Sequence, residues 1–129
     1  MIISFSRTSE AFLAGVKTVS RRDWSERYAM QWVKAWEEGR TRHQAWNKVP
    51  RCKGAHQIGY FDLTACVYQE RLADMSEEDV HAEGGLWLSK ENFIVQNGWE
   101  ESKVLWVVRF QKATPETEVI DSQVIAQSK

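Results

Sequence analysis

Glycine ends each helix that this sequence predicts, and this restricts the chain to short helical elements. Caps or helical spacing of apolar residues mark residues 8–15, 23–39, 75–83 and 89–97. The glycines at the ends of these segments are Gly15, Gly39, Gly84 and Gly98. Glycine readily adopts the left-handed conformation that terminates a helix.

Strand signals fill the segments between these helices. Residues 2–5 form a short apolar run, and residues 16–22 and 103–110 carry β-branched or apolar residues interleaved with polar ones. Residues 57–70 predict a long strand or a hairpin arm. This mixture of short strands and short helices predicts an α+β fold.

The longest predicted helix carries aromatic residues at every fourth position. These are Trp24, Tyr28, Trp32 and Trp36, and Asp23 with Glu26 is a plausible capping pair at the start. An aromatic stripe at this spacing is typical of a face that packs into the core. We therefore expect this stripe to be buried.

The length of the chain, 129 residues with 43% hydrophobic residues, suits one domain. Periodicity is lost after Phe110, so the domain is predicted to span residues 1–110 and to be followed by a polar C-terminal extension, residues 111–129.

The two cysteines, Cys52 and Cys66, lie outside any metal-ligand or disulfide spacing, so we expect free thiols, no metal and no cofactor. The first residues lack the apolar core of a signal peptide, and no later run is long enough to span a membrane. These features predict a cytoplasmic protein without a membrane partner.

Charge is divided unevenly along the chain. The net charge of −1 argues against a general nucleic-acid coat protein. Residues 1–57, however, hold 11 Lys and Arg against 5 Asp and Glu, whereas residues 58–129 hold 6 against 13. The first half could offer a basic face to anions, or the two halves could pair their charges in the folded protein.

The strongest concentration of cations falls in residues 40–56, which we interpret as a long basic loop. Its cations are predicted either to contact RNA phosphates or to be solvated loop charges. They are Arg40, Arg42, Lys48, Arg51 and Lys53. Trp46 in this loop and Trp87 beside Gly84 are candidates for stacking on a base, or for anchoring their loops to the core.

One motif carries a family resemblance. A short helix is followed by the motif Gly15-x-Lys17-Thr18-x-Ser20-x-Arg22-Asp23. A later strand begins with Ile58-Gly59-Tyr60, and an acidic helix ends in Glu83. Together these features resemble the ASCH family of the PUA-like superfamily over residues 1–110.

This resemblance implies a PUA-like β-barrel of about five to six strands with short helices at its rim. It also implies a charged cleft for RNA or a modified nucleoside. Small bacterial members of the family remove the acetyl group of N(4)-acetylcytidine with a Lys, a Thr three residues later and a Glu on the acidic segment. The corresponding positions here are Lys17, Ser20 and Glu83, with Ser in place of Thr.

Amide cleavage by these residues needs a nucleophile, a base and a group that stabilises charge. Ser20 is the candidate nucleophile, and Lys17 the base if burial and the neighbouring cations lower its pKa. Glu83 would hold the lysine ammonium or donate a proton to the leaving amine. Arg21 and Arg22 are candidates for substrate binding.

The spacing of Lys17 and Ser20 sets a condition on this mechanism. Residues three apart point to opposite faces of a regular strand, so Lys17 must lie in the turn before the strand. Gly15 makes such a turn plausible.

Three alternatives remain beside the amidohydrolase. The first is a non-catalytic RNA-binding module that reads single-stranded or modified bases. The second is a ribonuclease, for which Lys17, Arg22 and scattered histidines would supply the chemistry. The third is a purely structural ion-pair network of Lys17, Arg22 and Glu83.

Overall fold

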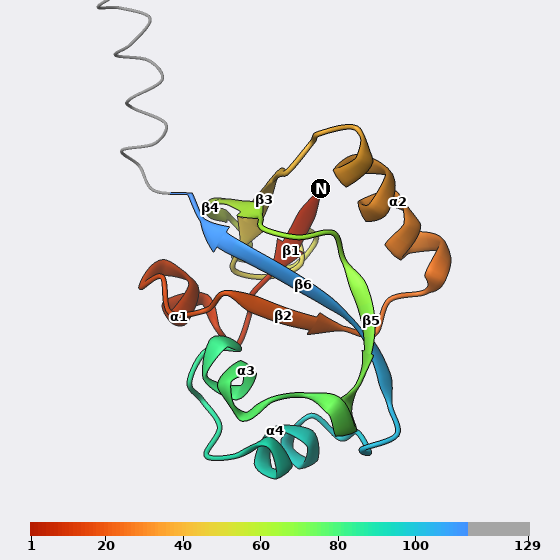
Figure 1. Ribbon diagram of the computed structural model, residues 1–129. Helices are drawn as coiled ribbons and strands as arrows, with labels where there is room; N and C mark the ends of the chain where they lie inside the picture. The colour runs from red at the N-terminus through yellow and green to blue at the C-terminus, as the bar shows by residue number, and fades with distance from the viewer. Residues whose placement is uncertain (114–129) are drawn as a thin grey trace, which may run out of the picture.

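The computed structural model describes residues 1–113, which form a curled mixed sheet with four α-helices around it (Figure 1). The strands are β1 (Ile2–Ser4), β2 (Val19–Arg22), β3 (Arg42–Trp46), β4 (Gln57–Leu63), β5 (Tyr68–Arg71) and β6 (Val104–Lys112). The α-helices are α1 (Ser9–Leu13), α2 (Glu26–Glu37), α3 (Glu77–Ala82) and α4 (Lys90–Gln96), with a 3₁₀ turn at Leu72–Asp74.

The six strands follow the order β1-β3-β4-β6-β2, and β5 also pairs with β6. All pairs are antiparallel except β1 with β3, which run parallel. Within the described residues, β1 and β2 end this order and do not pair with each other, so the sheet is a half-barrel and not a closed barrel. A side chain bridges the open seam, because Arg22 Nη2 on β2 donates to the Ser4 carbonyl oxygen on β1 at 3.0 Å.

Local sequence explains where the helices begin. The hydroxyls of Ser25, Ser76 and Ser89 accept hydrogen bonds from backbone N–H groups in the first turns of α2, α3 and α4. α1, α3 and α4 gather around one end of the half-barrel, and α2 lies at the other (Figure 1).

Two hydrophobic clusters hold these elements together. The larger one fills the half-barrel with Phe5, Phe12, Phe61 and Phe110 and covers Trp32, which has no exposed surface. Burial of a side chain of this size contributes about 2–3 kcal/mol to stability. The smaller cluster lies under α3 and α4 and consists of Leu72, Met75, Val80, Trp87, Phe93, Ile94 and Leu105.

Most predicted elements are confirmed, with shifts at their ends. The aromatic stripe packs on the core, since Trp32 is buried and Trp24, Tyr28 and Trp36 are partly buried against it. The predicted cap of α2 is wrong, because Ser25 caps the helix rather than the pair Asp23 and Glu26. The segment 57–70 divides into β4 and β5, and the last strand continues to Lys112.

The predicted loop over residues 40–56 is the main error. Residues 42–46 form β3, which pairs with β1 on one side and β4 on the other. The loop is therefore confined to residues 47–56, where the Asn47 side chain bonds both Gly54 and His56 and holds the turn closed. Of the predicted C-terminal extension, residues 114–129 lie outside the described part.

Cys52 and Cys66 are free thiols. None of the helices within residues 1–113 has the length and apolar character that a membrane crossing needs.

Candidate functional site

A pocket of about 250 Å³ lies at the seam where the half-barrel stays open. The segment after β1, the turn and strand of β2, the end of α3 and the region of α4 all contribute to it. Its charged and hydroxyl-bearing lining residues are Ser4, Ser6, Arg7, Thr8, Lys17, Ser20, Arg21, Arg22, Asp23 and Glu83. Its aromatic and amide lining residues are Phe5, Trp87, Phe93, Trp99 and Asn97.

Lys17 lies in the turn before β2, which is the position that the proposed chemistry requires. Gly15 adopts a φ of +76°, a value open to glycine. The Lys17 N–H then donates to the Ala11 carbonyl at 3.2 Å, and the Thr18 N–H donates to the Ala82 carbonyl of α3 at 2.8 Å. This backbone path places Lys17 and Ser20 in the lining of the same pocket.

Glu83 supplies both acceptors of the Lys17 ammonium. Lys17 Nζ donates to the Glu83 carbonyl oxygen at 2.6 Å and to Glu83 Oε1 at 3.2 Å. Both side chains are buried, with exposed fractions of 3% and 5%. Burial lowers the pKa of Lys17 from its ordinary value, the Glu83 carboxylate partly offsets this, and Arg22 lowers that pKa further.

Glu83 owes its place to a close approach between helices. It caps the C-terminal end of α3, and the next residue, Gly84, adopts a φ of +138°. A Cβ at Gly84 would lie 3.1 Å from Thr8 Cγ2, so a larger residue would push α3 away from α1. Gly84 thus allows α3 to bring Glu83 up to Lys17.

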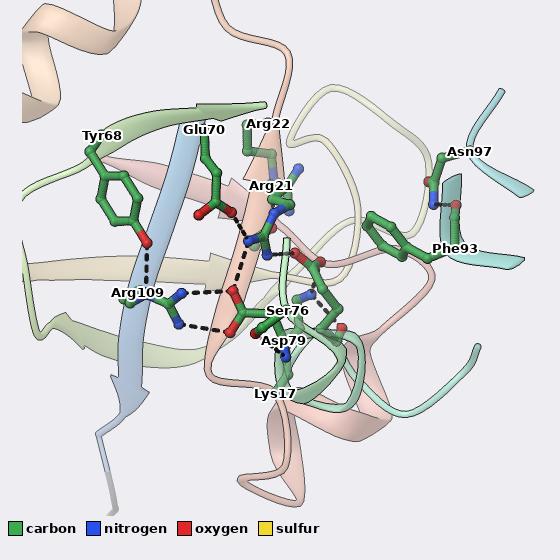
Figure 2. Close-up of polar contacts among 12 residues, drawn as sticks. Lys17, Arg21, Arg22, Tyr68, Glu70, Ser76, Asp79, Phe93, Asn97 and Arg109 are labelled. Carbon is green, nitrogen blue, oxygen red and sulfur yellow. Dashed lines mark hydrogen bonds and ion pairs between the residues drawn. The ribbon is translucent and has the colours of Figure 1, made fainter. Parts of the chain in front are cut away.

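Arg21 lines the pocket, and its guanidinium is bonded to three carboxylates of the protein, so its role as a substrate-binding residue stays a prediction. Its side chain is 1% exposed. It donates to Glu83 Oε2 at 3.3 Å, to Asp79 Oδ2 at 2.7 Å and to Glu70 Oε1 (Figure 2). Arg21 therefore fixes the second oxygen of Glu83, while Lys17 holds the first.

The network continues outward through Asp79. Arg109 on β6 donates to Asp79 Oδ1 at 3.0 Å and to Oδ2 at 2.7 Å, and it also binds the Tyr68 hydroxyl (Figure 2). Burial alone would raise the pKa of Asp79, but the hydrogen bonds from Arg109 and Arg21 outweigh it and hold this pKa below its usual range. Alternating charges thus connect the surface to the pocket floor.

Ser20 is held by Arg22. Arg22 Nε donates to Ser20 Oγ at 2.8 Å, and Ser20 is only 3% exposed. Because a guanidinium only donates, Ser20 Oγ must accept in this bond, and its own proton remains available to another acceptor. Within residues 1–113 the hydroxyl proton of Ser20 has no acceptor, and Lys17 Nζ donates only to Glu83. A hydrogen bond from Ser20 to Lys17 would therefore have to form when a ligand binds.

Aromatic side chains form a second part of the pocket lining. Trp87 and Phe93 meet edge to face with ring centroids 4.7 Å apart, and Trp99 lies 6.1 Å from Phe93. Trp87 was a predicted stacking residue, and it lines the pocket although it is 8% exposed. Trp99 and Asn97 were missed; their only local signal is their position on either side of Gly98, where α4 ends.

The other predicted binding residues lie outside this pocket lining. Trp46 is on β3, half-buried, and its indole N–H donates to Gln44 Oε1 at 2.9 Å. Arg40 pairs with Glu38, and Arg42 makes a two-pronged contact with Asp62 at 3.0 Å. Lys48, Arg51 and Lys53 are exposed on the loop 47–56.

A larger hollow of about 560 Å³ lies between the end of α1 and β6. Its two cations are already engaged, because Arg109 binds Asp79 and Lys112 Nζ donates to the Leu13 carbonyl at 2.7 Å. We take the seam pocket as the candidate site because it brings together the predicted residues Lys17, Ser20 and Glu83. Among the described residues, no group of three His, Cys, Asp or Glu side chains is arranged to hold a metal ion.

The seam pocket thus combines a fixed carboxylate, a buried lysine of lowered pKa, an oriented serine hydroxyl and an aromatic wall. Such a set suits a planar ligand that carries a polar group toward Ser20. Comparison of this chain with protein-family models, with curated proteins and with solved structures finds no match.

Proposed function

We propose that this chain is a small ASCH-type amidohydrolase with a PUA-like fold that acts on an acylated nucleoside such as N(4)-acetylcytidine. The supporting observation is the shared pocket: Lys17, Ser20 and Glu83, which the family resemblance singles out, line it together with Arg22. The half-barrel with helices at one end is also compatible with this family at a coarse level.

In the proposed mechanism, Ser20 Oγ attacks the acyl carbon while neutral Lys17 takes the hydroxyl proton. Arg22 holds Ser20 before attack and donates to the developing oxyanion. The C–N bond then breaks, and the proton passes from Lys17 to the departing amine. Water, activated by the same lysine, hydrolyses the acyl-serine to a carboxylate and restores both residues.

Glu83 has one of its two predicted roles in this scheme. Its two carboxylate oxygens accept hydrogen bonds from Lys17 and Arg21. Because both oxygens are already engaged as acceptors, Glu83 is better placed to orient the lysine than to donate a proton. We therefore assign Glu83 to positioning Lys17.

The test is hydrolysis of N(4)-acetylcytidine by the wild type and by Ser20→Ala, Ser20→Thr and Lys17→Ala. Removal of the base is expected to lower kcat by about 10²–10⁴-fold. Ser20→Ala should abolish acyl transfer, whereas Ser20→Thr keeps a hydroxyl and should retain measurable turnover. Ser25→Ala, which removes a hydroxyl that caps α2 outside the pocket lining, is the control. A wild type without turnover would end the proposal.

The exposed cations of the loop 47–56 favour a second candidate, binding of single-stranded RNA. Lys48, Arg51 and Lys53 have no carboxylate partner among residues 1–113. The loop also continues directly from Trp46, whose carbonyl accepts from the N–H of Phe5, a residue of the pocket lining. An RNA strand with one base in the pocket could pass over this loop.

Salt dependence tests this candidate. Binding of a short oligoribonucleotide should weaken with salt, and the combined change of Lys48, Arg51 and Lys53 to alanine should reduce the slope of log K against log salt by about 2. Arg71→Ala, which removes an exposed arginine paired with Asp74, is the control. A flat slope for the wild type would leave only a nucleoside-sized ligand.

A further inference from the structure

The aromatic side of the pocket carries one polar side chain whose orientation is fixed. Asn97 lines the pocket just after α4 and is half-buried. Its Nδ2 donates to the Phe93 carbonyl oxygen at 2.8 Å. Figure 2 shows the Asn97 amide and the Phe93 ring on the side of α4 that faces the charged network.

This hydrogen bond determines which end of the amide is available. A backbone carbonyl only accepts, so the NH₂ group must face Phe93 and the amide cannot turn over without placing two oxygens together. Oδ1 is therefore the end left over, and it accepts no hydrogen bond from any residue within 1–113. A side chain that is otherwise free to present a donor or an acceptor is restricted here to an acceptor.

The surroundings of this acceptor describe its ligand. Trp99, two residues later, is half-buried in the same pocket lining, and the Phe93 and Trp87 rings complete the wall. Aromatic walls bind planar rings, and a fixed acceptor beside such a wall selects a ring edge that carries a donor. A keto oxygen at the same place would face Oδ1 as a second acceptor and be disfavoured.

We propose that Asn97 is a specificity-determining residue that accepts a hydrogen bond from an exocyclic N–H of a pyrimidine ring stacked on Trp99, and so selects cytosine-type over uracil-type ligands. This inference rests on the proposed nucleoside function, because it concerns the same pocket. It adds the reason why the site would take one pyrimidine and reject the other.

The test measures dissociation constants of cytidine and uridine by titration calorimetry for the wild type, Asn97→Ala and Asn97→Ser. The wild type is expected to bind cytidine about tenfold more tightly than uridine, as one well-placed hydrogen bond allows. Asn97→Ala should bring the two constants to within about twofold. Asn97→Ser should do the same, and it protects the fold because a serine hydroxyl can still donate to the carbonyl four residues earlier.

Asn92→Ala is the matched control. Asn92 lies on the same helix, and its Oδ1 accepts from the Leu88 N–H at 3.3 Å, but it is outside the pocket lining. This variant should keep the preference for cytidine. Equal binding of the two nucleosides by the wild type, binding of neither, or a preference that survives Asn97→Ser would overturn the inference.

Hydrolysis of N(4)-acetylcytidine by the same proteins separates the two proposals. A wild type that discriminates between nucleosides without hydrolysing the substrate supports the role of Asn97 and removes the catalytic proposal. Hydrolysis together with a cytidine preference that is unchanged in Asn97→Ser supports the catalytic proposal and removes the role of Asn97.

Discussion

Lys17 shows how burial can prepare a lysine for the proposed role of a base. A lysine removed from water is harder to protonate, and here a single carboxylate neighbour compensates only in part, so its pKa stays below the ordinary value. The uncharged fraction that a base needs is thereby larger at neutral pH than for an exposed lysine. Desolvation is the larger cause, and Glu83 opposes it.

The opposing effects of burial and Glu83 predict the outcome of Glu83→Gln. Because the carboxylate raises the pKa of Lys17 toward normal, its neutral substitute should let that pKa fall further. NMR titration of the lysine ¹³Cε resonance is expected to show an inflection at lower pH in the variant than in the wild type. Glu91→Gln, an exposed change on α4, should leave it unmoved, and an upward shift in Glu83→Gln would contradict this account.

Among the elements, α3 depends most on its charged contacts. With six residues it is too short to be stable alone, and cations of other elements hold Asp79 in its first turn and Glu83 at its C-cap. Asp79 binds Arg21 of β2 and Arg109 of β6, and Glu83 binds Arg21 as well. The same contacts that hold the helix also hold the pocket.

Asp79→Asn is therefore expected to destabilise the protein. Removing one partner of a buried ion pair leaves the other charges uncompensated, which costs about 3 kcal/mol. Urea unfolding followed by tryptophan fluorescence measures this change. Asp74→Asn, which affects an exposed pair with Arg71, should change the free energy of unfolding by less than about 0.5 kcal/mol. Equal effects of the two changes would show that the Asp79 contacts contribute little.

Sequence predicts those elements whose signals are local. The aromatic stripe of α2 and the Ser76 cap of α3 need no distant partner to be recognised. The residues of β3 are mostly polar and predict a loop, whereas their strand conformation comes from pairing with β1 and β4. In the same way, folding of α4 against the seam places Asn97 and Trp99 in the pocket, which no spacing along the chain reveals.

At the scale of the whole molecule, part of the uneven charge of the sequence is paired within the fold. The basic first half and the acidic second half meet in the pairs Lys17 with Glu83, Arg21 with Asp79 and Arg42 with Asp62. The pairing of charges between the halves, one of the two interpretations of the composition, is thus present in the fold. The cations of the loop 47–56, Lys48, Arg51 and Lys53, remain exposed.

The burial of most of these pairs predicts a weak effect of salt on stability. Screening acts on exposed charges and much less on buried ones, so 1 M NaCl should change the free energy of unfolding by less than about 1 kcal/mol. Urea titrations at low and high salt measure the difference. A loss of several kcal/mol would mean that exposed pairs, and not the buried network, hold the halves together.

Both atoms that accept from Lys17 belong to the residue at the very end of α3. Fraying of that last turn would release the ammonium to water while the sheet is still intact. Mild heating should therefore abolish the proposed hydrolysis some degrees before the tryptophan signal reports global unfolding. The upper temperature limit of such an activity would then depend on one helical turn and not on the half-barrel.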